Sequence, residues 1–404
     1  MARNRVAITG LGCISALGHD VVSTWESLAQ GRTGIAPISL VPPESLTVRI
    51  AAEVKDFDWT RHFDERQNAM LDRFSQFAVI AAREAVKHAG LDIKGEFARR
   101  TAIIMGVGLG GMTTIDEGFH RLYAKNTPRS HPFTIPRLMP SAGASQVSMD
   151  LGITGPAFSV TSACASSNHA LGEAYWMVRS GRVDQALAGG SEACISYGSV
   201  RSWEALRVLA AAACRRFRMD RRGLVLGEGG GVIVLENWEH AKARGAKIYA
   251  ELAGFGQSAD AGDIVQPSDV GAAAAVSEAL ADSGLAPEQI GYINAHGTGT
   301  SINDVVETRA IKLAFGKQAG RVAISSTKSM HGHGLGAAGA LEIVATVKAV
   351  EAQLLPPTIA FTTPDPECDL DYVPNQPRPA AIEAALSNSF AFGGLNAVVA
   401  VKAV

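Results

Sequence analysis

The chain has 404 residues, of which 47% are hydrophobic and 19% are charged, so it can bury a larger core than one typical domain needs. Its formal net charge of -2 argues against a nucleic-acid-binding protein, which normally carries a clear basic excess. Five scattered cysteines form no CxxC pair, which favours neither a zinc site nor a disulfide framework. We find no signal peptide and no apolar run of about 18 residues, so we expect a cytoplasmic protein that does not cross a membrane.

Short β-branched segments alternate with longer alanine-rich segments along the chain. The predicted buried strands are 6–9, 102–105, 185–188 and 232–235. The predicted helices are 76–89, 169–179, 271–282 and 337–351. This alternation is typical of an α/β fold in which helices pack on sheets. Glycine-rich strand ends recur at 10–12 and 254–256, so we predict two related halves that meet near residue 250.

The segment 106–111 matches the pattern G-x-G-x-x-G and follows a predicted strand. A dinucleotide site also needs a second strand that ends in an acidic residue about twenty positions later. Here the chain instead reaches a loop with three prolines, Pro132, Pro136 and Pro140. We therefore do not predict nucleotide binding, and we expect these glycines to bring the backbone close to another chain or to an acyl ligand.

Cys164 is the cysteine with the most suggestive surroundings. It follows the strand-like segment 158–161 and opens a helix rich in small residues. The positive end of a helix favours a thiolate, and its free N–H groups stabilise an oxyanion. The alternative is a small buried core residue, which is the usual fate of a free cysteine. We assign that alternative to the other cysteines, Cys13, Cys194, Cys214 and Cys368.

Two histidine segments offer partners for this cysteine. His296 follows a predicted strand and is flanked by glycine and threonine, a setting in which it can point into a cleft. His331 and His333 lie two positions apart, which also suits a metal site, with Asp304 and Glu307 as further ligands. One cysteine with histidines distant in sequence is instead typical of nucleophilic catalysis. Both interpretations remain open at this point.

The densest basic run consists of five arginines, Arg215, Arg216, Arg218, Arg221 and Arg222. One interpretation is a solvated face with scattered ion pairs. The other is a docking patch for an acidic carrier domain or for the phosphate of a pantetheine arm.

Taken together, these motifs resemble the β-ketoacyl-[acyl-carrier-protein] synthase family, of the synthase II type within the thiolase superfamily. Some motifs are ordinary alone, but their joint order and spacing are specific and run nearly end to end. The segments that carry the resemblance are 6–12, 162–164, 188–192, 226–229, 294–300, 326–333, 365–371 and 388–394. Within the family, the chain looks most like nodulation-type synthases and synthases of specialised polyene pathways.

The resemblance implies a duplicated thiolase-like α/β fold with five layers, α-β-α-β-α. Residues 1–250 would form the half with the nucleophilic cysteine, and residues 251–404 the half with two catalytic histidines. The resemblance also implies a homodimer, with a heterodimer as the alternative, and the partners would be acyl carrier protein and the acyl and malonyl thioesters on its phosphopantetheine. No cofactor and no catalytic metal are implied.

The implied reaction is a decarboxylative Claisen condensation. Cys164 matches the nucleophile that takes the acyl group from the carrier, and His296 and His333 match the two catalytic histidines. The enolate left by loss of carbon dioxide would be stabilised by two neutral imidazoles. A thiolase is one rival, but it would want a second cysteine near the C-terminus, where 392–396 has none. A non-catalytic chain-length partner subunit is another rival, but such partners commonly lack the nucleophile.

Three further catalytic roles follow from the resemblance. Lys328 matches the lysine that supports the second histidine, and Glu307 matches its ion-pair partner. Phe392 matches a gating aromatic residue whose backbone N–H joins that of Cys164 in an oxyanion hole. His331 occupies a position where the family often has threonine, so we assign it no catalytic role.

The resemblance also indicates an acyl-binding pocket. Its predicted lining residues are Trp203, Leu109, Thr298, Thr300 and Phe390. Trp203 replaces a phenylalanine of relatives, and the bulkier indole would reshape or shorten the pocket. Relatives bind a structural cation near the positions of Glu342, Ser387 and Asn388.

The arginine run departs from the family pattern. Arg216 and Arg218 replace the usual proline and aspartate. Asp64–Phe74 keeps only two basic residues, Arg66 and Arg73, where other members have more. These departures predict altered carrier recognition.

Overall fold

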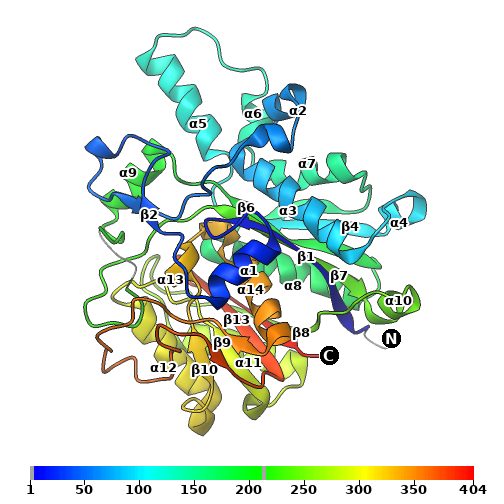
Figure 1. The fold of residues 1–404 in the computed structure, drawn as a ribbon, viewed down its shortest axis with the longest axis vertical. Coiled ribbons are helices and arrows are strands. Elements are labelled where there is room, and N and C mark those ends of the chain that lie inside the picture. The colour runs from blue at the N-terminus through cyan, green and yellow to red at the C-terminus, as the bar shows by residue number, and fades with distance from the viewer. Residues whose placement is uncertain (1–3, 212–214) are drawn as a thin grey trace.

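The framework of the chain is a 10-stranded sheet in the order β10-β9-β13-β14-β8-β1-β7-β6-β4-β5 (Figure 1). The computed structural model describes residues 4–211 and 215–404, and Cys214 lies outside them. The strands of the N-terminal set are β1 (Val6–Ser15), β4 (Thr101–Gly106), β5 (Ala157–Val160), β6 (Gln185–Glu192) and β7 (Gly229–Asn237). The strands of the C-terminal set are β8 (Ala250–Ala259), β9 (Ile290–Asn294), β10 (Ala323–Ser325), β13 (Ala384–Ala391) and β14 (Leu395–Lys402).

The two sets of strands repeat one pairing pattern. β6 pairs with β4 in parallel and with β7 antiparallel, and β7 continues antiparallel to β1. In the same way, β13 pairs with β9 in parallel and with β14 antiparallel, and β14 continues antiparallel to β8. Among the strands of the described residues, the two sets are hydrogen-bonded to each other through the short pairing of β1 with β8. This repeat confirms the duplicated fold, whereas the division into residues 1–250 and 251–404 stays a prediction.

Helices form three layers around these two sets (Figure 1). α3 (Arg73–Ala89) packs on β1 and β7, and α11 (Asp269–Ser283) packs on β8 and β14. α8 (Ser166–Arg179) contacts β6 and β14, and α14 (Ala338–Ala352) contacts β7 and β13, so both lie between the sets. The predicted order of five layers, α-β-α-β-α, is therefore confirmed.

Shorter elements surround this frame. The other helices are α1 (Val21–Ala29), α2 (Glu65–Ala69), α4 (Gly95–Arg99), α5 (Met112–Phe119), α6 (Thr134–Leu138), α7 (Ala142–Leu151), α9 (Tyr197–Ala205), α10 (Trp238–Ala243), α12 (Asn303–Phe315) and α13 (Lys328–His331). The short strands are β2 (Ala36–Pro37), β3 (Ile50–Ala51), β11 (Leu354–Leu355) and β12 (Arg378–Pro379).

The predicted strands exist, but they extend into glycine-rich segments that the sequence pattern left out. β1 continues through Gly10 and Gly12, where an added Cβ would lie 2.3 Å from the Ala85 oxygen and 2.0 Å from the Ala81 oxygen, respectively. Both oxygens belong to α3, so glycine is needed for this helix to approach the strand closely. Glycine weakens the strand signal in the sequence although it is required by the packing.

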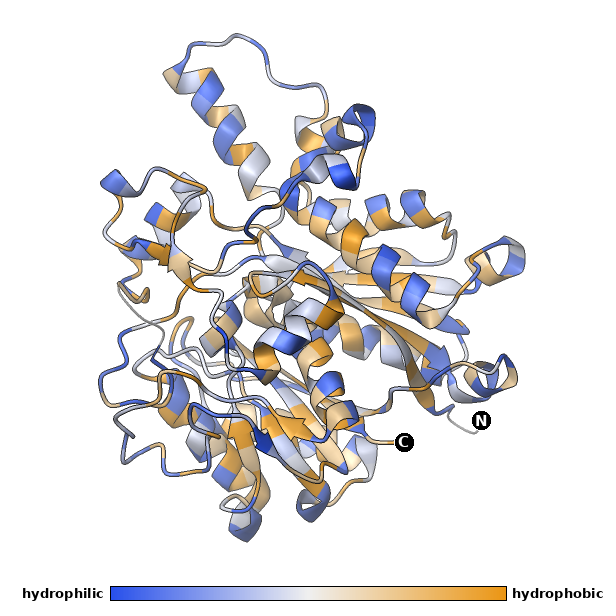
Figure 2. Ribbon diagram, viewed as in Figure 1, coloured by the Kyte–Doolittle hydropathy of each residue, from blue (hydrophilic) through white to orange (hydrophobic). Residues whose placement is uncertain are grey.

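The hydropathy pattern follows the layers. Figure 2 shows apolar residues along the central strands and polar residues on the outward turns of the outer helices. α14 is apolar nearly all round, and its residues from Ala338 to Val347 are all buried, as its place between two sets of strands requires. Within the described part of the chain, no helix has the length and apolar character that crossing a membrane requires.

Candidate active site

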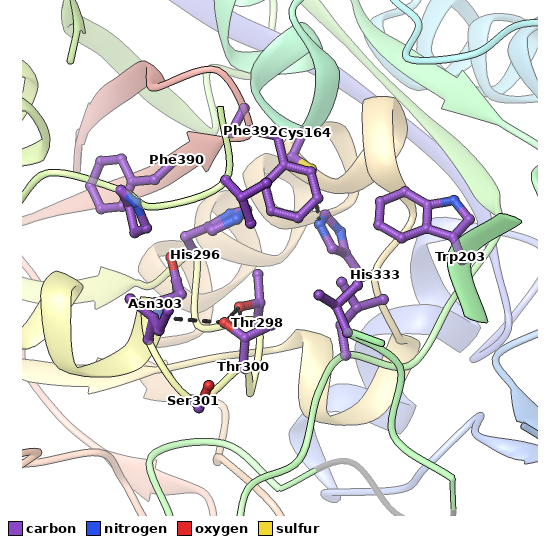
Figure 3. A pocket seen from close by; sticks show the side chains of 16 residues that line it. Cys164, Trp203, His296, Thr298, Thr300, Ser301, Asn303, His333, Phe390 and Phe392 are labelled. Carbon is purple, nitrogen blue, oxygen red and sulfur yellow. Dashed lines mark hydrogen bonds between the residues drawn. The ribbon is translucent and has the colours of Figure 1, made fainter. Parts of the chain in front are cut away.

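Cys164, His296 and His333 line one cavity of about 100 Å³ (Figure 3). Their ligand atoms lie within 4.8 Å of one another, although they come from three separate segments. The remaining lining is mainly apolar, with Trp203 and Phe390 on either side of Phe392. The structure therefore brings together the cysteine and the two histidines that the sequence assigned to one site.

A sharp turn presents Cys164. The residue follows β5 and lies on a single 3-10 turn, Ala163–Ala165, directly before α8. Ala163 has φ 49, a left-handed conformation that bulky residues rarely adopt. The backbone N–H groups of Cys164 and Phe392 both face the sulfur. Two N–H donors at this point are suited to hold a negatively charged oxygen on an atom bonded to Cys164.

Burial decides the protonation of this thiol. Cys164 is 7% exposed, and burial raises its pKa to about 12, although the charge of Lys328 and the two N–H groups lower it. The groups at the helix start still favour the thiolate, but burial outweighs them, so the resting thiol is neutral. His333 Nε2 lies 3.1 Å from the Cys164 sulfur, within reach of its proton.

The two histidines are buried and uncharged. Burial lowers the pKa of His296 and of His333 well below the usual range, and the nearby Lys328 charge lowers both further. Their ring centroids are 5.4 Å apart with an interplanar angle of 84°. A neutral imidazole has one N–H to donate, so the pair is suited to stabilise a negative oxygen placed between them.

Glu307 positions the loop that carries His296. Its carboxylate accepts the backbone N–H of His296 at 2.8 Å and of Gly297 at 2.7 Å. His333 is held through its backbone. Its backbone N–H donates to the Val225 oxygen at 2.7 Å, and its backbone oxygen accepts from the Gly227 N–H at 2.9 Å. The N-terminal half thus fixes a histidine of the C-terminal half.

The ion pair that the structure gives Lys328 is with Glu342, and both side chains are fully buried. The sequence assigned the partner of Lys328 to Glu307 and missed Glu342, and the pairing with Glu307 stays a prediction. The described contacts of Glu307 are the two backbone N–H groups and the Asn388 amide at 3.2 Å. Glu342 lies one turn into α14 and is 14 residues from Lys328, so only the fold reveals the pair.

Most predicted pocket residues line the cavity. Trp203 stacks on Phe392 with ring centroids 6.0 Å apart and an interplanar angle of 25°. Phe390, Thr298 and Thr300 also belong to the lining. Leu109 is not among the residues that line this cavity; it is 39% exposed, and its backbone N–H binds the Glu192 carboxylate.

The glycine motif 106–111 surrounds a carboxylate. Glu192 accepts N–H groups from Gly108 at 2.7 Å, Gly110 at 3.1 Å and Gly336 at 3.1 Å. These contacts lie within the chain, and the expected approach of the glycines to another chain or to the acyl ligand stays a prediction. Sequence reasoning missed Glu192, which couples this loop to the segment after His333.

The arginine run is mostly internal. Arg216, Arg218 and Arg221 are buried, which rules out a docking patch made of all five arginines. Arg218 and Arg215 both bind Asp220 at 2.7 Å, and Arg222 remains exposed. Arg73 lies in Asp64–Phe74, the other segment considered for carrier recognition. Its side chain forms an ion pair with Glu228 at 2.6 Å.

The proposed metal ligands are not assembled. His331 Nε2 contacts the Thr327 hydroxyl at 3.0 Å, and burial lowers the pKa of His331 to about 3. Asp304 accepts backbone N–H groups of Phe217 at 2.7 Å and Gly299 at 3.0 Å. Asp304 and Glu307, the carboxylates that the metal interpretation needs, thus accept hydrogen bonds from backbone N–H groups instead.

Glu342, Ser387 and Asn388, which the resemblance to the family placed at a structural cation site, have side chains that fit such an ion. Glu342 Oε2, Ser387 Oγ and Asn388 Oδ1 are buried and have no hydrogen-bond partner in the described part of the chain. Oxygen ligands suit a hard cation. These three residues would hold the cation, and the cation would neutralise negative charge on Oε2 of Glu342.

Comparisons with known proteins agree with this site. The chain matches the families described as "Beta-ketoacyl synthase, N-terminal domain" over residues 3–241 and "Beta-ketoacyl synthase, C-terminal domain" over residues 249–362. It is 50% identical to "Nodulation protein E" of Rhizobium sp. (strain N33), over 99% of both chains. It is 42% identical to "3-oxoacyl-[acyl-carrier-protein] synthase 2" of Staphylococcus aureus (strain N315), over 100% of this chain and 99% of that protein. Among solved structures, "The ishigamide ketosynthase/chain length factor" matches with a TM-score of 0.95 and 36% identity, over 100% of both chains.

Proposed function

The chain belongs to the β-ketoacyl synthase family, and from that premise we propose that Cys164, His296 and His333 carry out its condensation of acyl and malonyl carrier thioesters. The enzyme is an acyltransferase of the 3-oxoacyl-[acyl-carrier-protein] synthase type. The observation that carries the proposal is the joint placement of one thiol and two neutral imidazoles on one apolar cavity.

The first step transfers the acyl group. The Cys164 sulfur attacks the carbonyl carbon of an acyl carrier thioester while its proton passes to His333 Nε2, 3.1 Å away. The negative oxygen of the tetrahedral intermediate is held by the N–H groups of Cys164 and Phe392. The carbon–sulfur bond to the carrier then breaks, and the carrier thiol leaves with a proton.

The second step generates the carbon nucleophile. A malonyl carrier thioester occupies the cavity and loses carbon dioxide, which leaves an enolate at its thioester. The N–H groups of His296 and His333 stabilise the enolate oxygen, and the burial of both rings strengthens both contacts. Burial and, after it, the charge of Lys328, which pairs with Glu342, keep both imidazoles neutral.

The third step forms the carbon–carbon bond. The enolate carbon attacks the carbonyl of acyl-Cys164, and the backbone N–H groups of Cys164 and Phe392 hold the acyl oxygen that becomes negative, as in the first step. When the intermediate collapses, the bond from carbon to the Cys164 sulfur breaks. The product is a β-ketoacyl carrier thioester, and the released Cys164 thiolate takes up one proton from solvent.

The test of this function uses two isolated carriers. The protein is incubated with an acyl carrier and a malonyl carrier that is isotopically labelled in its free carboxyl group, and labelled carbon dioxide and β-ketoacyl carrier are measured. We expect both products, and we expect His296→Ala and His333→Ala to lose both. His331→Thr is the matched control, because its ring contacts Thr327 rather than Cys164, and it retains activity. Unchanged carbon dioxide release in both alanine variants would contradict the proposal.

The proposed partners are an acyl carrier protein and a second copy of the chain. A carrier appears in the name of the relative from Staphylococcus aureus. A second copy is supported by β5, which ends the strand order and exposes Ala157 and Phe158. The structure named for a ketosynthase and a chain length factor makes a heterodimer the alternative outcome. We place the protein in the cytoplasm, in keeping with four described cysteines that are all unpaired.

A further inference from the structure

Arg216 has the largest of the fully buried side chains in the described part of the chain, with 0% exposure. Its Nη1 donates to the Gly297 oxygen at 2.6 Å, and its Nη2 donates to the Lys328 oxygen at 3.1 Å. None of the described residues provides a carboxylate within 4.0 Å, and Nε has no hydrogen-bond partner there. A buried guanidinium held by carbonyls alone is costly, so it needs an explanation beyond stability.

The two carbonyls belong to the two segments that carry the catalytic histidines. Gly297 directly follows His296, and its N–H is held by Glu307. Lys328 opens α13, which ends at His331, two residues before His333. One planar guanidinium therefore connects the loop after β9 to the segment after β10.

The surroundings provide room for this connection. Gly299 has φ 79, and an added Cβ there would lie 3.3 Å from Arg216 Nη1. The Ser326 hydroxyl also donates to the Gly297 oxygen, at 2.8 Å. The Gly297 peptide is thus fixed on its N–H side by a carboxylate and on its oxygen side by two donors.

We propose that Arg216 is a positioning residue that sets the distance between His296 and His333 by bridging the Gly297 and Lys328 carbonyls. The proposal rests on the proposed function, because it concerns the pair of imidazoles that face the enolate. The bridge depends on the arginine side chain, at a position where the resemblance to the family leads us to expect proline.

The electrostatics of the site agree with this role. The Arg216 charge lowers the pKa of both His296 and His333, after the larger contributions of burial and of Lys328. The other ionisable groups facing the two rings are Cys164, which contacts His333, and His331. The carboxylates nearest to these segments are Glu307, which binds the His296 backbone, and Glu342, which pairs with Lys328. Removal of the Arg216 charge would therefore raise the pKa of both imidazoles.

The experiment compares three variants, Arg216→Met, Arg216→Lys and Arg218→Met. Arg218 is the matched control, because it is 9% exposed and binds the Ala360 oxygen and Asp220 instead of the histidine segments. Malonyl carrier decarboxylation is measured as kcat and KM across pH. The titration of the ring nitrogens is followed separately by NMR of ¹⁵N-histidine-labelled protein.

We expect Arg216→Met to lower kcat roughly tenfold to a hundredfold, because small misplacements of catalytic groups have effects of that size, with KM nearly unchanged. The acid side of its pH profile and the histidine titrations move to higher pH. Arg216→Lys keeps the charge and hence the pH profile, but it loses rate because an ammonium does not span two carbonyls. Arg218→Met leaves the pH profile and the histidine titrations in place.

Arg216→Met with wild-type kcat and wild-type histidine titrations would overturn the proposal. If Arg216→Met does not fold, Arg216→Lys is the deciding variant, and a wild-type kcat in Arg216→Lys would also overturn the proposal. A wild-type protein that decarboxylates no malonyl carrier would refute the proposed function, whereas the NMR titrations would still decide on Arg216.

Discussion

At the scale of single residues, Cys164 lies where two physical effects oppose each other. Its helix start and two N–H groups favour the thiolate, but burial favours the neutral thiol and raises the pKa to about 12. The enzyme therefore keeps an uncharged nucleophile until a substrate enters and His333 accepts the proton. This arrangement limits side reactions of the free cysteine.

The raised pKa predicts slow alkylation of Cys164. Because only the thiolate reacts, the rate with iodoacetamide should rise about tenfold per pH unit throughout roughly pH 6 to 9. Intact-mass measurement gives the rate, with Cys164→Ala as the control for other cysteines. A rate that levels off within this range would show that the thiol ionises far more easily than its burial implies.

We expect Trp203 to limit the length of the acyl chain that the cavity binds. It lines the cavity and stacks on Phe392, so a smaller residue lengthens the space beside Cys164. We expect Trp203→Ala to raise kcat/KM for longer acyl carriers roughly tenfold over the wild type, as one or two methylene groups in an apolar pocket allow. Trp203→Phe, which keeps an aromatic ring of smaller size, should give a preference between the two. An unchanged preference over a panel of acyl carriers rejects this role.

At the scale of elements, the site depends on close contacts between loops. Gly108 and Gly336 meet around the Glu192 carboxylate, and an added Cβ at Gly336 would lie 2.1 Å from the Gly108 nitrogen. This contact holds the segment after His333 against the segment after β4. The glycines of the motif therefore serve packing and the capture of a carboxylate.

Gly336→Ala should consequently destabilise the protein by about 3 kcal/mol through overpacking of backbone. We expect the melting temperature to fall on the order of 5 °C and activity to fall with it. Gly118→Ala, next to the last residue of α5, is the control, because nothing lies within 4 Å of an added Cβ there. Calorimetry should show the control unchanged or slightly more stable. Equal melting temperatures for both variants would contradict the packing argument.

The sequence predicted these elements unevenly. The alternation of strands and helices was correct, but glycine-rich strand ends such as Gly10 and Gly12 were missed because their signal lies in packing against α3. Cys164, His296 and His333 were found because their motifs are local. The Lys328–Glu342 pair and the Glu192 contacts join distant segments, so no local pattern encodes them.

At the scale of the whole molecule, one edge of the sheet is left open. β10, at the opposite end of the strand order, is buried, but β5 exposes its first two residues, and Phe158 is 39% exposed. An exposed edge with apolar side chains is a template for pairing with another strand. Cys164 follows this strand by four residues, so pairing at β5 would support the turn that presents it.

We therefore expect Phe158→Asp to convert a dimer into a monomer with lower activity. Light scattering coupled to size exclusion gives the mass, and Val22→Asp is the control, because Val22 is 66% exposed on α1 rather than on the edge strand. A variant that keeps the wild-type mass would place the contact elsewhere. Co-purification with a different chain would instead indicate a heterodimer.

The central claim is that both halves of the molecule contribute to one covalent reaction at Cys164. Its most direct measurement is the intact mass of the protein after incubation with an acyl carrier, followed by peptide mapping. We predict a mass gain of one acyl group on the peptide with Cys164, and its loss on addition of malonyl carrier as β-ketoacyl carrier forms. Product formation with no acyl group on Cys164, or with the acyl group on another residue, would contradict the account.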